Sequence, residues 1–304
     1  NRSGATLDDF RNRAISDTFE PGSTVKPMVL MTALQQGIVQ PDSVVDTHPY
    51  VIDGHRIRDV GYYPELTLTG ILQKSSDTGV SRLSLAMPIQ KLLDTYKNFG
   101  FGTPTGLGLT GESRGSLPVR RYWGQLDRAT FSFGYGLMVT PLQLAHVYAT
   151  IGSFGLARPL SITRVDPPVM GTQVMPANIV HQVEHMMESV ALPGGGGTKA
   201  AVRDYRVAVK TGTAKKIGDD GKYVDKYVAY TAGVAPASHP EYALVVVIDD
   251  PKNGAYYGGA VSAPVFSEIM TRVLRVENVE PDGLRPGDDH LLVLNSANAA
   301  DATR

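Results

Sequence analysis

Three strand-like runs near the end of the chain limit its fold more than any other feature. Residues 205–214, 223–235 and 242–249 are rich in β-branched and aromatic side chains, and the first run alternates in polarity. Only an Asp-Asp-Gly turn signal and a short proline-containing loop separate them. Because connections this short join antiparallel neighbours, the sequence predicts an antiparallel three-stranded sheet.

The remaining segments have mostly helical patterns. Between residues 67 and 190, apolar stripes recur at helical spacing, and glycine-rich segments connect them. An amphipathic stripe at residues 265–274 predicts a further helix that covers the sheet. We therefore predict an α+β fold for residues 1–276, in which an antiparallel sheet is flanked by helices and an all-helical lobe, residues 67–190, is inserted beside it. The polar residues 277–304 are expected to form a loosely held tail.

Composition excludes several classes of function. The formal net charge is -1, which favours neither nucleic acid nor an anionic membrane surface as the main partner. The chain contains no cysteine, so disulfide scaffolds, cysteine nucleophiles and cysteine-ligated metals are excluded. His181 and His185 have i,i+4 spacing without a metalloprotease pattern, so we expect surface histidines and neither a metal nor a cofactor. The longest aliphatic run, residues 243–248, is far shorter than the ~20 residues of a membrane-spanning helix.

The stretch from Thr24 to Gln36 is apolar on every side and predicts a buried helix, with Ser23 at its amino end. Lys26 lies one turn further along. Side chains three residues apart share a helix face, so the Lys26 amine can reach the Ser23 hydroxyl. Burial disfavours the ammonium form and would make this lysine a base. Alone, the Ser-x-x-Lys pair is a weak signal, because serine often caps helices.

Two further motifs strengthen the catalytic interpretation. Ser75-Ser76-Asp77 precedes a helical stripe, and Lys210-Thr211-Gly212 lies on the alternating strand. Ser-x-x-Lys, Ser-x-Asn and Lys-Thr-Gly, in this order, are the signature of serine penicillin-recognising enzymes, and Ser-x-Asp replaces Ser-x-Asn here. A helix start, a loop and a strand could bring the three motifs to one cleft between the sheet and the helical lobe.

Longer segments resemble the transpeptidase domain of class B penicillin-binding proteins. The resemblance runs from about Phe10 to Val276 and includes FEPGSTVKPMVLMTAL, ELTLTGILQKSSDTGVSRL and RATFSFGYGLMVTPLQLAHVYATI. It implies a D,D-transpeptidase that joins a D-Ala-D-Ala donor stem of peptidoglycan to an amine acceptor and is acylated by β-lactams. It further implies septal cell-wall synthesis during division, divisome membrane proteins as partners, and the periplasmic side of the bacterial inner membrane. The family's anchor helix, pedestal domain and first sheet strands normally precede this region, so we expect either that the sequence is part of a longer protein or that the domain is truncated.

The resemblance also implies catalytic roles. Ser23 would be the nucleophile and Lys26 its base. Ser75 would relay protons between Lys26, Lys210 and the leaving nitrogen. The backbone N–H groups of Ser23 and Thr213 would form the oxyanion hole.

The strand with the third motif would bind the donor. Its Thr211 and Thr213 would hold the terminal carboxylate, and Lys210 would add positive charge. Alternation sends the two threonines to one face and Lys210 and Gly212 to the other, so one ligand can meet them all only along the strand's edge. We therefore predict that residues 209–214 form an edge strand that pairs with substrate, and that Gly212 permits close approach. In the alternative interpretation, Thr211 and Thr213 do not bind the carboxylate and are ordinary β-branched strand residues.

Asp77 departs from the family, which nearly always has asparagine at this position. An asparagine amide can donate and accept, whereas an ionised aspartate only accepts. Asp77 would also pair with Lys26 and favour its charged form, which weakens the base. Protonation restores one donor to Asp77, so we expect acylation to be displaced toward acidic pH relative to an asparagine-bearing relative.

A β-lactam-hydrolysing or sensing protein of the same fold is the alternative, as a serine β-lactamase, a D,D-carboxypeptidase or a penicillin sensor. Class A β-lactamases carry a glutamate that activates the deacylating water, and no convincing Glu-x-x-Leu-Asn lies between Asp77 and Lys210. A sensor shares the motifs but normally joins a membrane signalling segment. The lifetime of the penicilloyl adduct separates a β-lactamase from the other candidates.

Overall fold

The computed structural model describes residues 11–218, 220–252 and 254–283. The predicted tail beyond residue 283 lies outside the described residues. In the ranges that are described, no helix combines the length and the apolar character that a membrane span needs.

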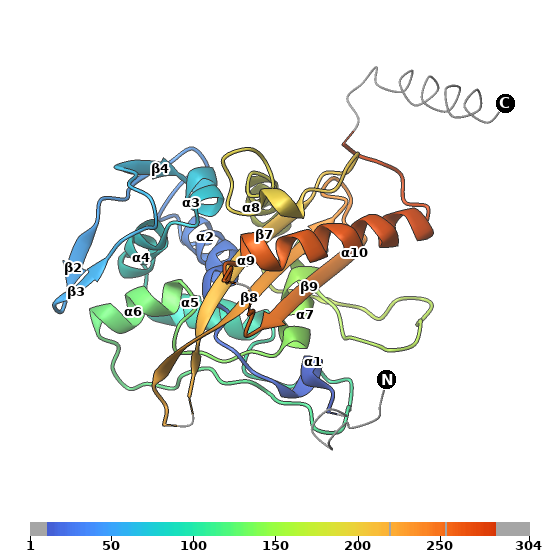
Figure 1. Ribbon diagram of the computed structural model, residues 1–304, viewed down its shortest axis with the longest axis horizontal. Coiled ribbons are helices and arrows are strands. Elements are labelled where there is room, and N and C mark those ends of the chain that lie inside the picture. Colours follow the sequence, from blue (N-terminus) through green and yellow to red (C-terminus); the bar gives the residue numbers. More distant parts are fainter. Residues whose placement is uncertain (1–10, 219, 253, 284–304) are drawn as a thin grey trace.

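A three-stranded antiparallel sheet lies at the centre of the molecule (Figure 1). Its strands are β7 (Ala208–Ile217), β8 (Tyr223–Ala235) and β9 (Tyr242–Asp249), in the order β7-β8-β9. The predicted antiparallel pairing is confirmed, and β8 and β9 have the predicted bounds. β7 begins three residues later than the sequence predicts, because the Arg206 N–H donates to the Asp282 carboxylate and not to a neighbouring strand.

Helices cover both faces of this sheet. The helix α10 (Ala263–Val276) and the short α9 (Gly258–Val261) lie over one face, and α7 (Pro141–Gly152) and its neighbour α8 (Ala177–Glu188) lie over the other (Figure 1). Two successive residues of β8 show the arrangement. A Cβ on Gly233 would touch Phe266 of α10, whereas Val234 packs against Gly152 of α7. The C-terminal amphipathic helix therefore covers the sheet as predicted.

The segment from residue 67 to 190 is mostly helical. Besides α7 and α8, it contains α3 (Leu68–Lys74), α4 (Asp77–Ala86), α5 (Ile89–Asn98) and α6 (Gln125–Ser132). The two-residue strands β5 (Leu156–Ala157) and β6 (Thr172–Gln173) interrupt it, and they are too short to show a periodic pattern. Because α7 packs against the sheet, the limits of a separate helical lobe remain a prediction.

A buried helix, α2 (Lys26–Gln35), contacts α4, α5 and α8. Every residue from Lys26 to Ala33 is buried, as the all-round apolar pattern predicts, and Pro27 lies in the first turn. The helix begins two residues later than predicted, because a 3-10 turn, η2 (Gly22–Val25), precedes it. The Thr24 hydroxyl tightens this turn by donating to the Pro21 carbonyl oxygen at 2.6 Å.

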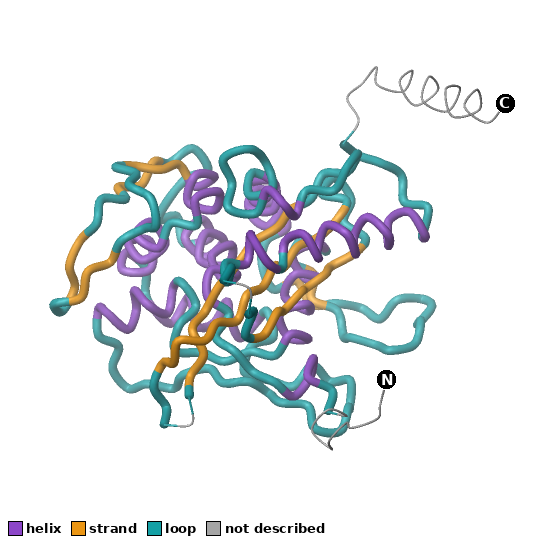
Figure 2. The backbone as a smooth tube through the Cα atoms, in the orientation of Figure 1, coloured by secondary structure: helices purple, strands orange, loops and turns teal. Residues whose placement is uncertain are grey.

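Two small strand pairs have no counterpart among the predicted elements. β1 (Val44–Asp46) pairs with β4 (Glu65–Thr67), and β2 (Tyr50–Ile52) pairs with β3 (His55–Ile57). Strands of three residues are too short for alternation to reveal them. Both pairs lie beside the helices and away from the central sheet (Figure 2).

Candidate active site

Ser23 lies in the η2 turn, where the chain passes close to the sheet. A Cβ on Gly22 would lie 2.4 Å from the Tyr230 hydroxyl, and a Cβ on Gly134 would lie 2.2 Å from the Gly22 carbonyl oxygen. Glycine is therefore required at both positions. The Gly22 N–H also donates to the Gly134 carbonyl at 3.2 Å. These contacts place Ser23 next to β7, half-buried at the amino end of α2.

Lys26 is fully buried, and its amine bonds to the second motif. Its Nζ donates to the Ser75 carbonyl at 2.6 Å, to the Ser75 hydroxyl at 3.1 Å and to Asp77 Oδ1 at 2.6 Å. Three acceptors match the three N–H groups of an ammonium ion. Among the described residues, the Ser23 hydroxyl makes no hydrogen bond, so the expected Lys26–Ser23 contact is not formed. The Asp77 carboxylate and the Ser75 carbonyl attract the amine toward α4 instead.

Ser75 lies between the two lysines. Its hydroxyl is 3.1 Å from Lys26 Nζ and 2.9 Å from Lys210 Nζ. Ser75 ends α3 in the left-handed region, with φ 56°, and its N–H donates back to carbonyls of α3. A non-glycine residue pays roughly 1–2 kcal/mol for this conformation. The conformation allows the Ser75 carbonyl and hydroxyl both to accept from Lys26.

Lys210 has no exposed surface, and its amine also donates to the Thr211 carbonyl at 3.0 Å. Burial and the nearby Lys26 charge hold the pKa of Lys210 well below its usual value, and Asp77 opposes them in part. No carboxylate in the described part of the chain forms an ion pair with Lys210, whereas Asp77 pairs with Lys26. The cluster therefore combines one ion-paired lysine and one readily deprotonated lysine, with a hydroxyl between them.

The third motif lies on a free sheet edge, because β7 pairs only with β8 among the described strands. A Cβ on Gly212 would lie 2.0 Å from the Tyr230 ring, so only glycine lets β7 pack here. The Thr213 hydroxyl oxygen accepts from the Gly258 N–H at 2.9 Å. Its own hydrogen is left available to a ligand. Thr211, 9% exposed, lies on the same strand.

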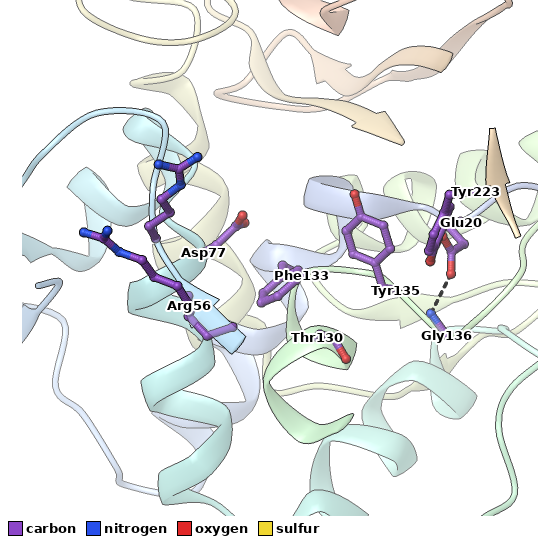
Figure 3. Close-up of a pocket in the computed structure, with 10 residues that line it drawn as sticks. Glu20, Arg56, Asp77, Thr130, Phe133, Tyr135, Gly136 and Tyr223 are labelled. Atoms are coloured by element: carbon purple, nitrogen blue, oxygen red, sulfur yellow. Dashed lines mark hydrogen bonds between the residues drawn. The ribbon is translucent and has the colours of Figure 1, made fainter. Parts of the chain in front are cut away.

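A pocket of about 520 Å³ opens beside Asp77 (Figure 3). Arg56 lies at one end of the pocket, and Tyr135, Tyr223 and Glu20 lie at the other. Glu20 accepts from the Gly136 N–H at 2.8 Å and from the Tyr223 hydroxyl at 2.9 Å, while burial raises its pKa. Burial and the charges of Asp77 and Glu20 raise the pKa of Tyr135 to about 12. The pocket therefore offers charged groups of both signs next to the second motif.

Apart from Asp77, these pocket residues are absent from the site predicted from the sequence. Arg56 comes from a hairpin too short to predict, and Tyr135 from a glycine-rich turn. Only Glu20 among them could have been predicted from the sequence, because it lies beside the first motif, three residues before Ser23. His181 and His185 are exposed, and no group of residues in the described ranges could hold a metal ion.

Comparison with known proteins assigns this arrangement to a family. The model of the penicillin binding protein transpeptidase domain matches residues 1–271. Peptidoglycan D,D-transpeptidase FtsI of Escherichia coli (strain K12) is 65% identical over 295 residues, which cover 97% of this chain and 50% of the relative. A probable peptidoglycan D,D-transpeptidase PenA of Neisseria gonorrhoeae is 39% identical, over 92% of this chain and 48% of the relative. The chain thus spans about half the length of the curated relatives that it matches.

Solved structures give the same result. The apo transpeptidase (TP) domain of Burkholderia pseudomallei penicillin-binding protein 3 superimposes with a TM-score of 0.85 at 37% sequence identity. The match covers 91% of this chain and 84% of that one. The predicted α+β fold of the family is therefore confirmed.

Proposed function

The chain belongs to the penicillin-binding protein transpeptidase family, and on that premise we propose that it is a serine D,D-transpeptidase that cross-links peptidoglycan stem peptides. The donor is a stem that ends in D-Ala-D-Ala, and the acceptor is an amine of a neighbouring stem. The cluster of Lys26, Ser75 and Lys210 next to Ser23 carries the proposal, because it supplies both a base and a proton route.

Acylation begins when Lys210 takes a proton from Lys26 through the Ser75 hydroxyl, which leaves Lys26 neutral. The neutral amine then takes the proton of the Ser23 hydroxyl, and the Ser23 oxygen bonds to the donor carbonyl carbon. The carbon–nitrogen bond to the last D-alanine breaks, and the leaving nitrogen takes, through the Ser75 hydroxyl, the proton that Lys26 received from Ser23. The Lys26 amine must turn toward Ser23 for this step, since its hydrogen bonds in this structure are with Ser75 and Asp77.

Cross-linking reverses these steps with a different amine. The acceptor nitrogen bonds to the acyl carbon, the bond from that carbon to the Ser23 oxygen breaks, and the proton of the amine returns to Ser23 through Lys26. The N–H groups of Ser23 and Thr213 stabilise the oxyanion in both halves, and loss of one such donor typically lowers the rate ~10²–10³-fold. Thr211, Thr213 and Lys210 bind the donor carboxylate, a role supported by the free hydroxyl hydrogen of Thr213.

The family further supports a cellular role. We infer that β-lactams acylate Ser23 as donor mimics, and that the protein acts in septal cell-wall synthesis with divisome membrane proteins. Its site of action is the periplasmic face of the bacterial inner membrane, to which a helix elsewhere in the protein anchors it. The name of the E. coli relative, a peptidoglycan D,D-transpeptidase, supports the reaction.

Product analysis tests this function. The protein is incubated with a D-Ala-D-Ala stem peptide and an amine acceptor, and released D-alanine and joined peptide are measured by mass spectrometry. We expect both products, and their loss in Ser23→Ala but not in Ser161→Ala, which removes an exposed loop hydroxyl. D-Alanine release with only hydrolysed donor would identify a carboxypeptidase. Release of neither product would contradict the proposal.

A further inference from the structure

The carboxylate of Asp59 forms hydrogen bonds with the segment that carries the second motif. Ser75 and Asp77 contact Lys26, whereas the alternate residues Ser76 and Thr78 are fully buried on the opposite side. Asp59 accepts from the Ser76 hydroxyl at 2.6 Å, from the Thr78 N–H at 2.9 Å and from the Thr78 hydroxyl at 2.7 Å. Both of its oxygens are therefore used on this segment.

These bonds are strong for two reasons. Hydrogen bonds to an ionised carboxylate are roughly twice as strong as those between neutral groups. Asp59 also lies at the amino end of the ten-residue helix α4, where the helix dipole favours a negative charge. Ser76 caps the same helix, because its hydroxyl oxygen accepts from the Gly79 N–H at 2.9 Å. Asp59 thus fixes the cap residue and the second residue of α4 together.

Ser75 depends on this support because its backbone is strained. It adopts φ 56° between the end of α3 and the start of α4. A strained residue keeps its conformation only where the surrounding structure over-determines it. The bonds of Asp59 to the two residues that flank Asp77 provide that restraint on the carboxyl side of Ser75.

We propose that Asp59 is a positioning residue that holds the Ser75 hydroxyl and the Asp77 carboxylate at hydrogen-bond distance from the catalytic lysines. This role rests on the proposed function. Asp59 touches neither substrate nor a reacting atom, and it acts through Ser76 and Thr78. Asp59→Asn leaves one acceptor oxygen where the carboxylate has two, so it cannot accept all three bonds, although the Thr78 hydroxyl also lies 3.2 Å from the Thr47 carbonyl oxygen. The remaining bonds lose the strength of the charge, and the segment can relax away from Lys26 and Lys210.

The test separates binding from bond formation. Acylation by benzylpenicillin is measured over a range of concentrations, which gives the dissociation constant of the first complex and the rate constant of acylation. In Asp59→Asn we expect the rate constant to fall on the order of 10–10²-fold, because small misplacements of catalytic groups have effects of this size. The dissociation constant should change less than about twofold, since the donor site on β7 is untouched. Completed labelling counts the folded, active molecules, so a loss of folded protein is not mistaken for a slow rate.

A matched control and a double-mutant cycle complete the test. Asp53→Asn removes an exposed carboxylate from the turn of the β2–β3 hairpin, which precedes the loop that carries Asp59, and should behave as the unchanged protein. If Asp59 acts through Thr78, the double variant Asp59→Asn/Thr78→Val should be about as slow as the slower single variant. If the double variant is slowed by the product of the two single-variant factors, the proposal is overturned. An unchanged rate in Asp59→Asn would overturn it as well.

Three outcomes separate the positioning role from the proposed function. If Asp59→Asn does not fold, Thr78→Val carries the test, and a normal acylation rate in it overturns the positioning role. If the unchanged protein is not labelled at all, both the proposed function and this role are wrong. Normal labelling of the unchanged protein together with a normal acylation rate constant in Asp59→Asn removes the positioning role alone.

Discussion

The buried amine of Lys210 lies 2.9 Å from the hydroxyl oxygen of Ser75. Because burial and the Lys26 charge hold the pKa of Lys210 well below its usual value, this lysine is more readily neutral than an exposed lysine and can take up a proton. Arginine cannot do so, although it keeps a positive charge. Lys210→Arg should therefore lower the rate constant of penicillin acylation ~10²–10⁴-fold, the usual effect of a lost acid–base group. Lys215→Arg, an exposed position on the same strand, is the control, and equal rates in both variants would contradict proton transfer by Lys210.

Asp77 should set the pH dependence of acylation. Its carboxylate lies 2.6 Å from Lys26 Nζ, and 39% of the side chain is exposed. Protonation removes the counter-charge of Lys26 and supplies the donor that asparagine would provide. We predict that the unchanged protein reaches its highest acylation rate at a lower pH than Asp77→Asn does. Rate profiles measured from pH 4.5 to 9 check this, and superimposable curves would rule it out.

Glu184 should make stability fall as pH rises. Burial, with Glu188 nearby, raises the pKa of Glu184 to about 8, whereas the unfolded chain has the usual value of 4.5. Between these values the folded state binds more protons than the unfolded state, so the free energy of unfolding decreases with pH by up to about 1.4 kcal/mol per pH unit. Glu184→Gln removes this pH dependence of the free energy of unfolding. The melting temperature of Glu184→Gln minus that of the unchanged protein should be larger at pH 8 than at pH 5. A difference that does not vary with pH would contradict a buried neutral Glu184.

Gly212 should tolerate no side chain. A Cβ there would lie 2.0 Å from the Tyr230 ring, so Gly212→Ala must separate β7 from β8 or turn the tyrosine. Overpacking of this kind typically destabilises by 1–3 kcal/mol, and it also displaces the edge that carries Thr211 and Thr213. We expect a lower melting temperature and slower acylation together. Gly124→Ala, at a helix cap with φ -63° and more room, should change both only slightly. Normal acylation in Gly212→Ala would show that the β7 edge is not the donor site.

The sequence predicts the central elements well because their patterns are long. The runs that became β8 and β9 are continuous and bounded by clear turn signals, and the apolar surround of α2 marks it as buried. The motif residues Lys26, Ser75 and Lys210 also meet as predicted, since their helix start, loop and strand converge.

Details that depend on tertiary contacts could not be predicted. The sequence predicts that the Lys26 amine can reach Ser23, whereas in the structure it donates to a carbonyl and a carboxylate that are distant in the sequence. The restraint by Asp59 comes from a loop after a three-residue strand, where no periodic pattern exists. Only the folded chain brings these groups together.

The site of covalent labelling tests the central claim most directly. The protein is treated with benzylpenicillin, its intact mass is measured, and the adduct is located by digestion and fragmentation. We predict one penicilloyl group per molecule, on Ser23, which persists for hours and is absent from Ser23→Ala. An adduct on another residue, continued labelling of Ser23→Ala at the same rate, or release within seconds would contradict a transpeptidase that uses Ser23 as its nucleophile.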